Sequence, residues 1–320
     1  MLTDKPLSEL WTYKGSNPKP ADFDEFWNRA LAEVAATDPA LRLERAAAPL
    51  HPRDVELFDL WFTGVGGARI YAKYVRPKKI PAKLPTVLEF HGYSASSNDW
   101  SGKLRYPGEG VAIASMDCRG QGGRSEDLGG AKGNTLIGHL VRGLGDSPEK
   151  LYYRNVFLDT VQLARVVMSL DETDASHIAS TGGSQGGGLA LACAAFVPEV
   201  ARCCAVFPFL SDYQRTFEME VATYPYSEIR EYMRRFNVHG ETTEAIFERM
   251  GYIDVHHLAP RIKAECLVVL ANMDTLVPPS TQFAVYNCIE APKRHVLYPY
   301  HGHEGLPYVD DRTFDFLTWK

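Results

Sequence analysis

The sequence predicts an α/β fold with a mostly parallel central sheet, and three observations favour this class. Short, densely apolar runs recur along the chain, as expected for strands of a sheet that is covered on both faces. Segments of helical periodicity lie between these runs, so that strands are regularly followed by helices. The earliest strand candidates instead alternate polar and apolar residues, which is typical of antiparallel strands.

The first two strands are expected at residues 55–62 and 70–75, on either side of the glycine-containing segment 63–67, which is typical of a hairpin. Denser strand candidates follow at 86–90, 111–115, 177–181, 202–207, 266–270 and 295–298. Apolar residues at helical spacing predict helices at 22–36, 152–170, 185–196, 279–289 and 311–319. We therefore expect residues 1–320 to form a single domain with helices on both faces of the sheet.

Two segments depart from the regular alternation of strands and helices. Residues 1 to about 45 are expected to be an N-terminal helical extension. Residues 211–258 contain no strand candidate, but apolar residues recur at helical spacing over 226–236 and 242–250. We interpret this segment as a helical insertion that returns to the sheet at Cys266. Such an insertion can form a lid or a substrate wall, or it can be a peripheral packing unit, and the sequence leaves these interpretations open.

Composition and charge argue against several classes of function. The 320 residues include 34 Lys and Arg against 40 Asp and Glu, and the net charge of −6 disfavours nucleic acid, which needs a concentrated basic surface. No apolar run reaches the roughly 18–20 residues that a membrane-spanning helix needs, and the N-terminal residues do not resemble a secretory signal. The six cysteines lack C-x-x-C spacing, so most are expected to be buried thiols. We therefore expect a cytoplasmic protein with no metal and no other cofactor.

The strongest functional signal is the sequence TGGSQGGG at residues 181–188. It contains G-x-S-x-G as Gly182, Ser184 and Gly186, between a predicted strand and a predicted helix. In that context the motif predicts a nucleophile elbow, where a serine occupies a strained turn and glycines avoid clashes with the flanking elements. The fold class is then an α/β-hydrolase with Ser184 as nucleophile. The backbone N–H of Gln185 would point toward the reacting carbonyl.

A serine nucleophile needs a base and an acid that orients the base, and in this fold they follow the serine in the order acid, histidine. Asp274 comes just after a predicted strand. His301 and His303 lie in the loop after the last predicted strand, and spacing alone does not separate them. Both loops are expected at the same sheet edge as Ser184. Asp254 is the alternative acid, but it lies in the insertion rather than after a strand.

An oxyanion hole needs a second backbone N–H from the loop after an earlier strand. The sequence HGY at 91–93 directly follows a predicted strand, which makes the N–H of Tyr93 the candidate beside that of Gln185. The glycine-rich sequence RGQGG at 119–123 lacks the G-K-[ST] ending of a phosphate loop. Nucleotide binding is therefore not expected.

With these residues in place, essentially the whole chain resembles the acetyl xylan esterases and cephalosporin C deacetylases of carbohydrate esterase family 7. The matching segments are RGQ at 119–121, GGSQGG at 182–187, GHE at 302–304, HGY at 91–93, YYR at 152–154 and PPST at 278–281. The resemblance implies that Ser184, Asp274 and His303 form the catalytic triad. It also implies that the N–H groups of Tyr93 and Gln185 form the oxyanion hole.

The activity that this resemblance implies is a serine carboxylesterase acting through an acetyl-enzyme intermediate. Its substrates would be small acetyl esters, such as acetylated xylo-oligosaccharides and cephalosporin C. The resemblance further implies a homohexamer whose active sites face an inner cavity. Two alternatives remain: a serine peptidase of the prolyl-oligopeptidase type and a non-catalytic binding protein with a hydrolase fold. The lack of a long N-terminal propeller argues against the first, and the intact serine, acid and histidine argue against the second.

Overall fold

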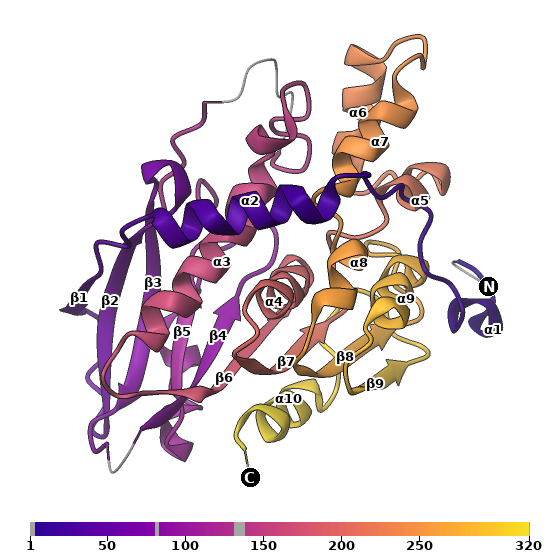
Figure 1. Ribbon diagram of the computed structural model, residues 1–320. Helices are drawn as coiled ribbons and strands as arrows, with labels where there is room; N and C mark the ends of the chain where they lie inside the picture. Colours follow the sequence, from indigo (N-terminus) through magenta and orange to yellow (C-terminus); the bar gives the residue numbers. More distant parts are fainter. Residues whose placement is uncertain (1–3, 81–82, 131–137, 320) are drawn as a thin grey trace.

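The computed structural model of the chain describes residues 4–80, 83–130 and 138–319. The described residues form a nine-stranded sheet with the order β1-β2-β3-β5-β4-β6-β7-β8-β9 (Figure 1). The strands are β1 (Arg42–Arg45), β2 (Val55–Thr63), β3 (Arg69–Pro77), β4 (Leu84–Phe90), β5 (Ala112–Met116), β6 (Thr173–Gly183), β7 (Val200–Val206), β8 (Glu265–Ala271) and β9 (Lys293–Tyr298). The pairings from β1 through β3 to β5 are antiparallel, and the others are parallel. This is the mostly parallel α/β arrangement that the sequence predicts.

Helices cover both faces of the sheet, and adjacent strand residues pack on opposite sides. The helices are α1 (Leu7–Leu10), α2 (Phe23–Ala36), α3 (Tyr152–Met168), α4 (Gln185–Phe196), α5 (Tyr213–Glu218), α6 (Ser227–Phe236), α7 (Thr243–Gly251), α8 (Val255–Leu258), α9 (Pro279–Cys288) and α10 (Val309–Leu317). Figure 1 shows α3 and α4 on one face and α10 on the other. In β4, Leu88 belongs to the hydrophobic cluster that includes α3 and α4, whereas Val87 packs with Phe316 and Leu317 of α10.

The structure corrects the expected N-terminal helical extension at its end. Residues 42–45 form β1, which pairs with β2 in the register Leu43↔Leu60. The sequence RLER has no apolar alternation and is mostly exposed, so no pattern indicated a strand. It forms a strand because the outer edge of β2 offers backbone groups that need partners. The helical part of the extension is α1 and α2.

The insertion at 211–258 is helical, as predicted, and contains α5 to α8 without any strand. In Figure 1, α6 and α7 project beyond the sheet. The short helix α1 lies against α9, beside the last strands. The organisation of the chain as one domain with these two additions remains a prediction.

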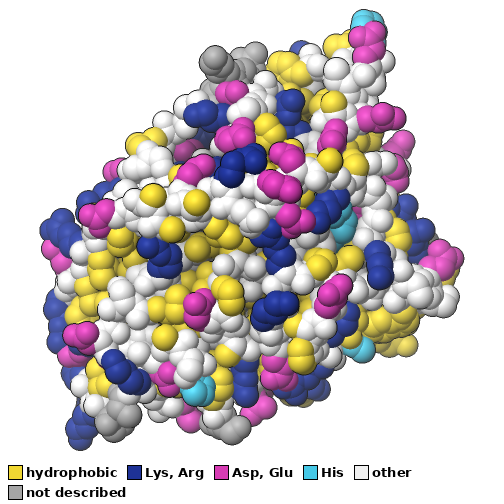
Figure 2. All heavy atoms as spheres, viewed as in Figure 1, with side chains coloured by type: hydrophobic (Ala, Val, Ile, Leu, Met, Phe, Trp, Pro, Cys, Tyr) yellow, Lys and Arg dark blue, Asp and Glu magenta, His cyan; other side chains and the backbone are white. Residues whose placement is uncertain are grey.

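Charged side chains of both signs are interspersed over the face shown in Figure 2. This mixed surface agrees with the modest net charge of −6. All six cysteines are free and five of them are buried, which confirms that most are buried thiols. Among the described helices, none combines the length and apolar character needed to cross a membrane.

Candidate active site

Ser184 lies in the turn between β6 and α4, where its backbone has φ 57° and ψ −122°. A positive φ is strained for a residue with a side chain. The flanking glycines make the turn possible. A Cβ at Gly182 would lie 2.6 Å from the carbonyl oxygen of Phe90, and a Cβ at Gly186 would lie 2.0 Å from the same atom. The strained strand-to-helix turn predicted for Ser184 is therefore present, and it depends on these two glycines.

Asp274 follows β8, His303 follows β9, and their side chains are in contact. The Nδ1 atom of His303 lies 2.8 Å from Oδ2 of Asp274. The other carboxylate oxygen accepts the N–H groups of Leu276 at 2.9 Å and Val277 at 2.8 Å. Gln282 Nε2 donates to Oδ2 at 3.2 Å. Because Asp274 is only 1% exposed, these bonds fix a buried carboxylate in one orientation, directed at the imidazole.

The structure distinguishes the two histidines that spacing left equivalent. The ring of His301 packs edge-on against Tyr298, with ring centroids 5.4 Å apart. Its buried Nδ1 has no hydrogen-bond partner within the described part of the chain. The ring of His303 instead packs on Phe207 at 4.4 Å and bonds to Asp274. His303 is thus the histidine paired with the acid.

Ser184 and His303 line the same cavity of about 490 Å³. The strands before Ser184, Asp274 and His303 are β6, β8 and β9, which run parallel in the sheet order β6-β7-β8-β9, so the loops that follow them lie at one edge of the sheet. Gly92 also lines this cavity, and so does the ion pair of Lys103 with Glu89. The cavity is therefore small and partly polar, and Ser184 is part of its wall.

The loop that carries Tyr93 is hydrogen-bonded to the side chain of Gln185. Gln185 is fully buried, and its Nε2 donates to the carbonyl oxygen of His91 at 3.2 Å. Its Oε1 accepts from the Tyr153 hydroxyl at 2.7 Å and from Gln121 Nε2 at 2.9 Å. These bonds hold the loop containing Tyr93 beside the N-terminus of α4.

Two residues of the glycine-rich loop support the site in ways that the sequence did not predict. Arg119 Nε and Nη2 donate to the two carboxylate oxygens of Asp159 at 2.7 and 2.6 Å, and both side chains are buried. Gln121 Oε1 accepts the N–H of Ser94 at 2.9 Å, next to Tyr93. The sequence feature that could have indicated their role is an Arg and a Gln in a loop that is otherwise rich in glycine and directly follows a buried strand.

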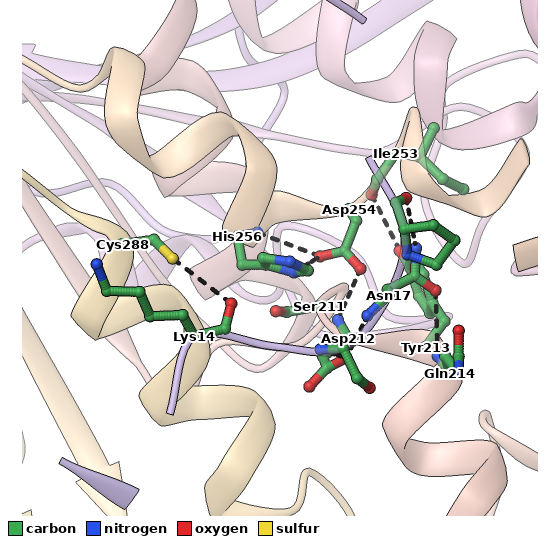
Figure 3. Close-up of polar contacts among 12 residues, drawn as sticks. Lys14, Asn17, Ser211, Asp212, Tyr213, Gln214, Ile253, Asp254, His256 and Cys288 are labelled. Carbon is green, nitrogen blue, oxygen red and sulfur yellow. Dashed lines mark hydrogen bonds and ion pairs between the residues drawn. The ribbon is translucent and has the colours of Figure 1, made fainter. Parts of the chain in front are cut away.

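Asp254, the alternative acid, belongs to a separate buried network (Figure 3). One of its oxygens lies 2.6 Å from His256 Nδ1, and the other accepts the N–H of Asp212 at 2.8 Å. Asp254, His256 and His257 place ligand atoms within 4.8 Å of one another, so this group could hold a metal ion. No spacing in the sequence indicated this group, and the expectation from the sequence was a protein without a metal. Both oxygens of Asp254 already have protein partners, and its side chain also accepts the N–H of His256 as the N-cap of α8. This structural role explains why a carboxylate is buried here.

A serine in a strained strand-to-helix turn, followed in the chain by an acid and a histidine at the same sheet edge, defines the α/β-hydrolase class. Residues 1–319 also match the family model of the acetyl xylan esterases, described as acetyl xylan esterase (AXE1). The chain therefore belongs to the acetyl xylan esterase family, a family of carboxylic ester hydrolases.

Two known proteins similar to this chain are named acetyl xylan esterases, and a third is named an acetyl esterase. Acetyl xylan esterase 1 from Thermoanaerobacterium sp. JW/SL YS485 is 46% identical, with 98% of each chain covered and a TM-score of 0.96. The acetyl xylan esterase from Paenibacillus sp. R4 is 35% identical, with 98% of this chain and 99% of that chain covered and a TM-score of 0.93. The acetyl esterase Axe7A of Xylanibacter ruminicola is 28% identical over 292 residues, which are 89% of this chain. The match spans 63% of that longer relative.

Proposed function

We propose that this chain is a serine esterase that removes acetyl groups from small esters, with Ser184, Asp274 and His303 as its catalytic triad. The observation that carries the proposal is the 2.8 Å contact between His303 Nδ1 and Asp274 Oδ2, made beside the cavity that Ser184 lines. Membership of the acetyl xylan esterase family supports the same chemistry. In the first step His303 Nε2, oriented through Nδ1 by Asp274, accepts the proton of Ser184 Oγ while that oxygen attacks the acetyl carbonyl carbon.

The tetrahedral intermediate carries its negative charge on the former carbonyl oxygen. The backbone N–H groups of Tyr93 and Gln185 would donate hydrogen bonds to that oxyanion. The C–O bond to the alcohol then breaks, and His303 returns its proton to the leaving oxygen. A water molecule, deprotonated by His303, then attacks the acetyl carbon of the acetyl-serine. The bond between that carbon and Ser184 Oγ breaks, His303 returns the proton to Oγ, and acetate leaves.

We propose acetylated xylo-oligosaccharides and cephalosporin C as substrates. The relatives at 46% and 35% identity are both named acetyl xylan esterases. A cavity of about 490 Å³ suits a small ester. Its polar lining, with Glu89, Lys103 and Ser115, suits an alcohol that carries further hydroxyl groups better than a long acyl chain.

A panel of substrates tests this function. We expect turnover of p-nitrophenyl acetate, acetylated xylobiose and cephalosporin C, and values of kcat/KM at least about tenfold lower for hexanoyl than for acetyl esters, because a small pocket excludes longer chains. The measurement is the initial rate for each ester and for a peptide p-nitroanilide. Cleavage of the peptide amide without ester turnover would favour the prolyl-oligopeptidase alternative. Acetylation of one serine per chain without turnover would favour the non-catalytic alternative.

We also propose that the chain assembles into a homohexamer. The proposal follows from the family resemblance, whose members place their active sites toward an inner cavity. Light scattering during size exclusion is expected to give about six times the chain mass of 35.7 kDa. A monomer that persists at micromolar concentration contradicts the hexamer.

The cytoplasm is the location that we propose for this chain. All six cysteines are free thiols, and five are buried. Unpaired cysteines fit a reducing compartment better than an oxidising one, where disulfides form and persist.

A further inference from the structure

A buried carboxylate connects the helical insertion to the proposed oxyanion hole. Glu228 lies on α6 and its residue is 0% exposed. Its Oε1 accepts a hydrogen bond from the Tyr93 hydroxyl at 2.5 Å, and its Oε2 accepts the N–H of Leu140 at 2.8 Å. The Tyr93 hydroxyl in turn accepts the N–H of His139 at 2.6 Å. Three segments far apart in the sequence therefore meet at the side chain of Tyr93.

The insertion also contacts the ring of Tyr93. Tyr224 packs edge-on against it, with ring centroids 5.2 Å apart, and Phe209 does the same at 6.0 Å. The hydroxyl of Tyr224 lies 3.3 Å from Ser94 Oγ. Since Tyr224 and Glu228 both belong to the insertion, that segment contacts both the ring and the hydroxyl of Tyr93.

The backbone on either side of Tyr93 is held by two glutamine side chains, from Gln185 at the start of α4 and from Gln121 in the loop after β5. The carbonyl oxygen of His91 accepts from Gln185 Nε2 at 3.2 Å, and the N–H of Ser94 donates to Gln121 Oε1 at 2.9 Å. These bonds restrain the residues before and after Tyr93. The peptide group that carries the Tyr93 N–H is held at its carbonyl end, because Gly92 O lies 2.7 Å from His91 Nδ1 and accepts the N–H of Ala95 at 3.2 Å. On the nitrogen side this peptide group is attached to the Tyr93 Cα, and the position of that atom depends on where the Tyr93 side chain is fixed. Glu228 is the group that accepts the hydrogen bond from the Tyr93 hydroxyl.

We propose that Glu228 is a positioning residue for ester hydrolysis: by binding the Tyr93 hydroxyl it fixes the peptide N–H of Tyr93 toward the oxyanion. The inference rests on the proposed role of Tyr93 in the oxyanion hole. Donors of this kind lower the barrier only when they are aligned before the charge develops, so a small displacement reduces the rate. Packing alone does not require a carboxylate at this position. Burying one is costly, and burial raises the pKa of Glu228 to about 7.

Substitutions that keep the shape of the network test this role. In Glu228→Gln, an amide NH₂ replaces one of the two acceptor oxygens. Either the Tyr93 hydroxyl or the Leu140 N–H then faces a donor and loses its acceptor. Tyr93→Phe breaks the same contact by removing the hydroxyl that donates to Glu228. At a pH of about 8.5, where Glu228 of the wild type is ionised, each variant should lower kcat for p-nitrophenyl acetate roughly 10- to 100-fold, which is less than the loss of an entire donor. The KM should change less than about threefold.

An inhibitor separates positioning from a merely structural role. An aryl trifluoromethyl ketone forms a tetrahedral oxyanion adduct with an active serine, so its Ki depends on the oxyanion hole. We expect Ki to rise in both variants by the same factor as kcat falls, and the double variant to be no worse than the poorer single variant, because both act through one contact. Should Glu228→Gln fail to fold, the kcat and Ki of Tyr93→Phe decide the question.

The matched control is Glu231→Gln on the same helix. Glu231 pairs with Arg234 at 2.8 Å, so this change removes a charge without altering the Tyr93 network. It should retain the kcat and Ki of the wild type. A lowered Tm with unchanged kcat and Ki in Glu228→Gln and Tyr93→Phe would overturn the positioning role. A wild-type chain that hydrolyses no ester would instead overturn the proposed function, and the inference with it.

Discussion

Replacing Ser184 with alanine is expected to abolish ester hydrolysis, with a loss of kcat near 10⁶-fold, the scale seen when a nucleophilic serine is removed from another serine hydrolase. The substitution removes the only atom that can form the acetyl-enzyme in the proposed mechanism. The positive φ at residue 184 is equally unfavourable for alanine, so the fold should be retained. The measurement is the steady-state hydrolysis of p-nitrophenyl acetate, with the Tm of each protein recorded alongside.

Ser180→Ala is the matched control for this loss. Ser180 lies on β6, the strand that precedes Ser184; it is buried and donates its hydroxyl to the carbonyl oxygen of Ala190 at 2.9 Å. Its removal should cost about 1 kcal/mol of stability while leaving kcat near the wild-type value. Full activity in a folded Ser184→Ala protein would remove the serine from the mechanism.

Asp274→Asn carries the second largest expected effect, a fall in kcat of about 10⁴-fold, as for the equivalent change in another serine hydrolase. One oxygen of Asp274 accepts two backbone N–H groups, and the asparagine oxygen can retain those bonds. The amide NH₂ then faces His303 Nδ1, where the wild type presents an acceptor. The imidazole is left in the wrong tautomer to accept the proton of Ser184. The same ester assay measures this loss, and circular dichroism checks the fold.

Asp171→Asn is the matched control for Asp274→Asn, because it also replaces one carboxylate with an amide. Asp171 is exposed and follows α3, so its substitution should alter kcat by less than about twofold. If Asp274→Asn also kept more than about a tenth of the wild-type kcat, the acid would not be orienting the base. Asp254 would still be a poor replacement, because its carboxylate is bonded to His256 and Asp212.

Much of the site could be predicted from the sequence because its signals are local. The motif around Ser184 requires glycines where β4 and α4 approach closely, and those glycines are visible in the sequence. Asp274 follows an apolar strand that is easy to recognise. Spacing could not separate His301 from His303, since both lie in one loop and differ only in which ring reaches the acid. The family resemblance favoured His303, and the structure pairs it with Asp274.

Other features required the tertiary structure because they depend on contacts between distant segments. β1 has no apolar pattern, and it is a strand only because β2 offers an edge to pair with. Glu228 on α6 resembles any charged residue of an amphipathic helix until folding brings it to the Tyr93 hydroxyl, 135 positions away. The sequence by itself determined the order of the strands from β2 onward and of the longer helices, the strained turn at the serine and the strand ends that carry the acid and the histidine. Only the tertiary structure decided which polar side chains share a buried partner, because a hydrogen bond depends on distance in space and not on separation along the chain.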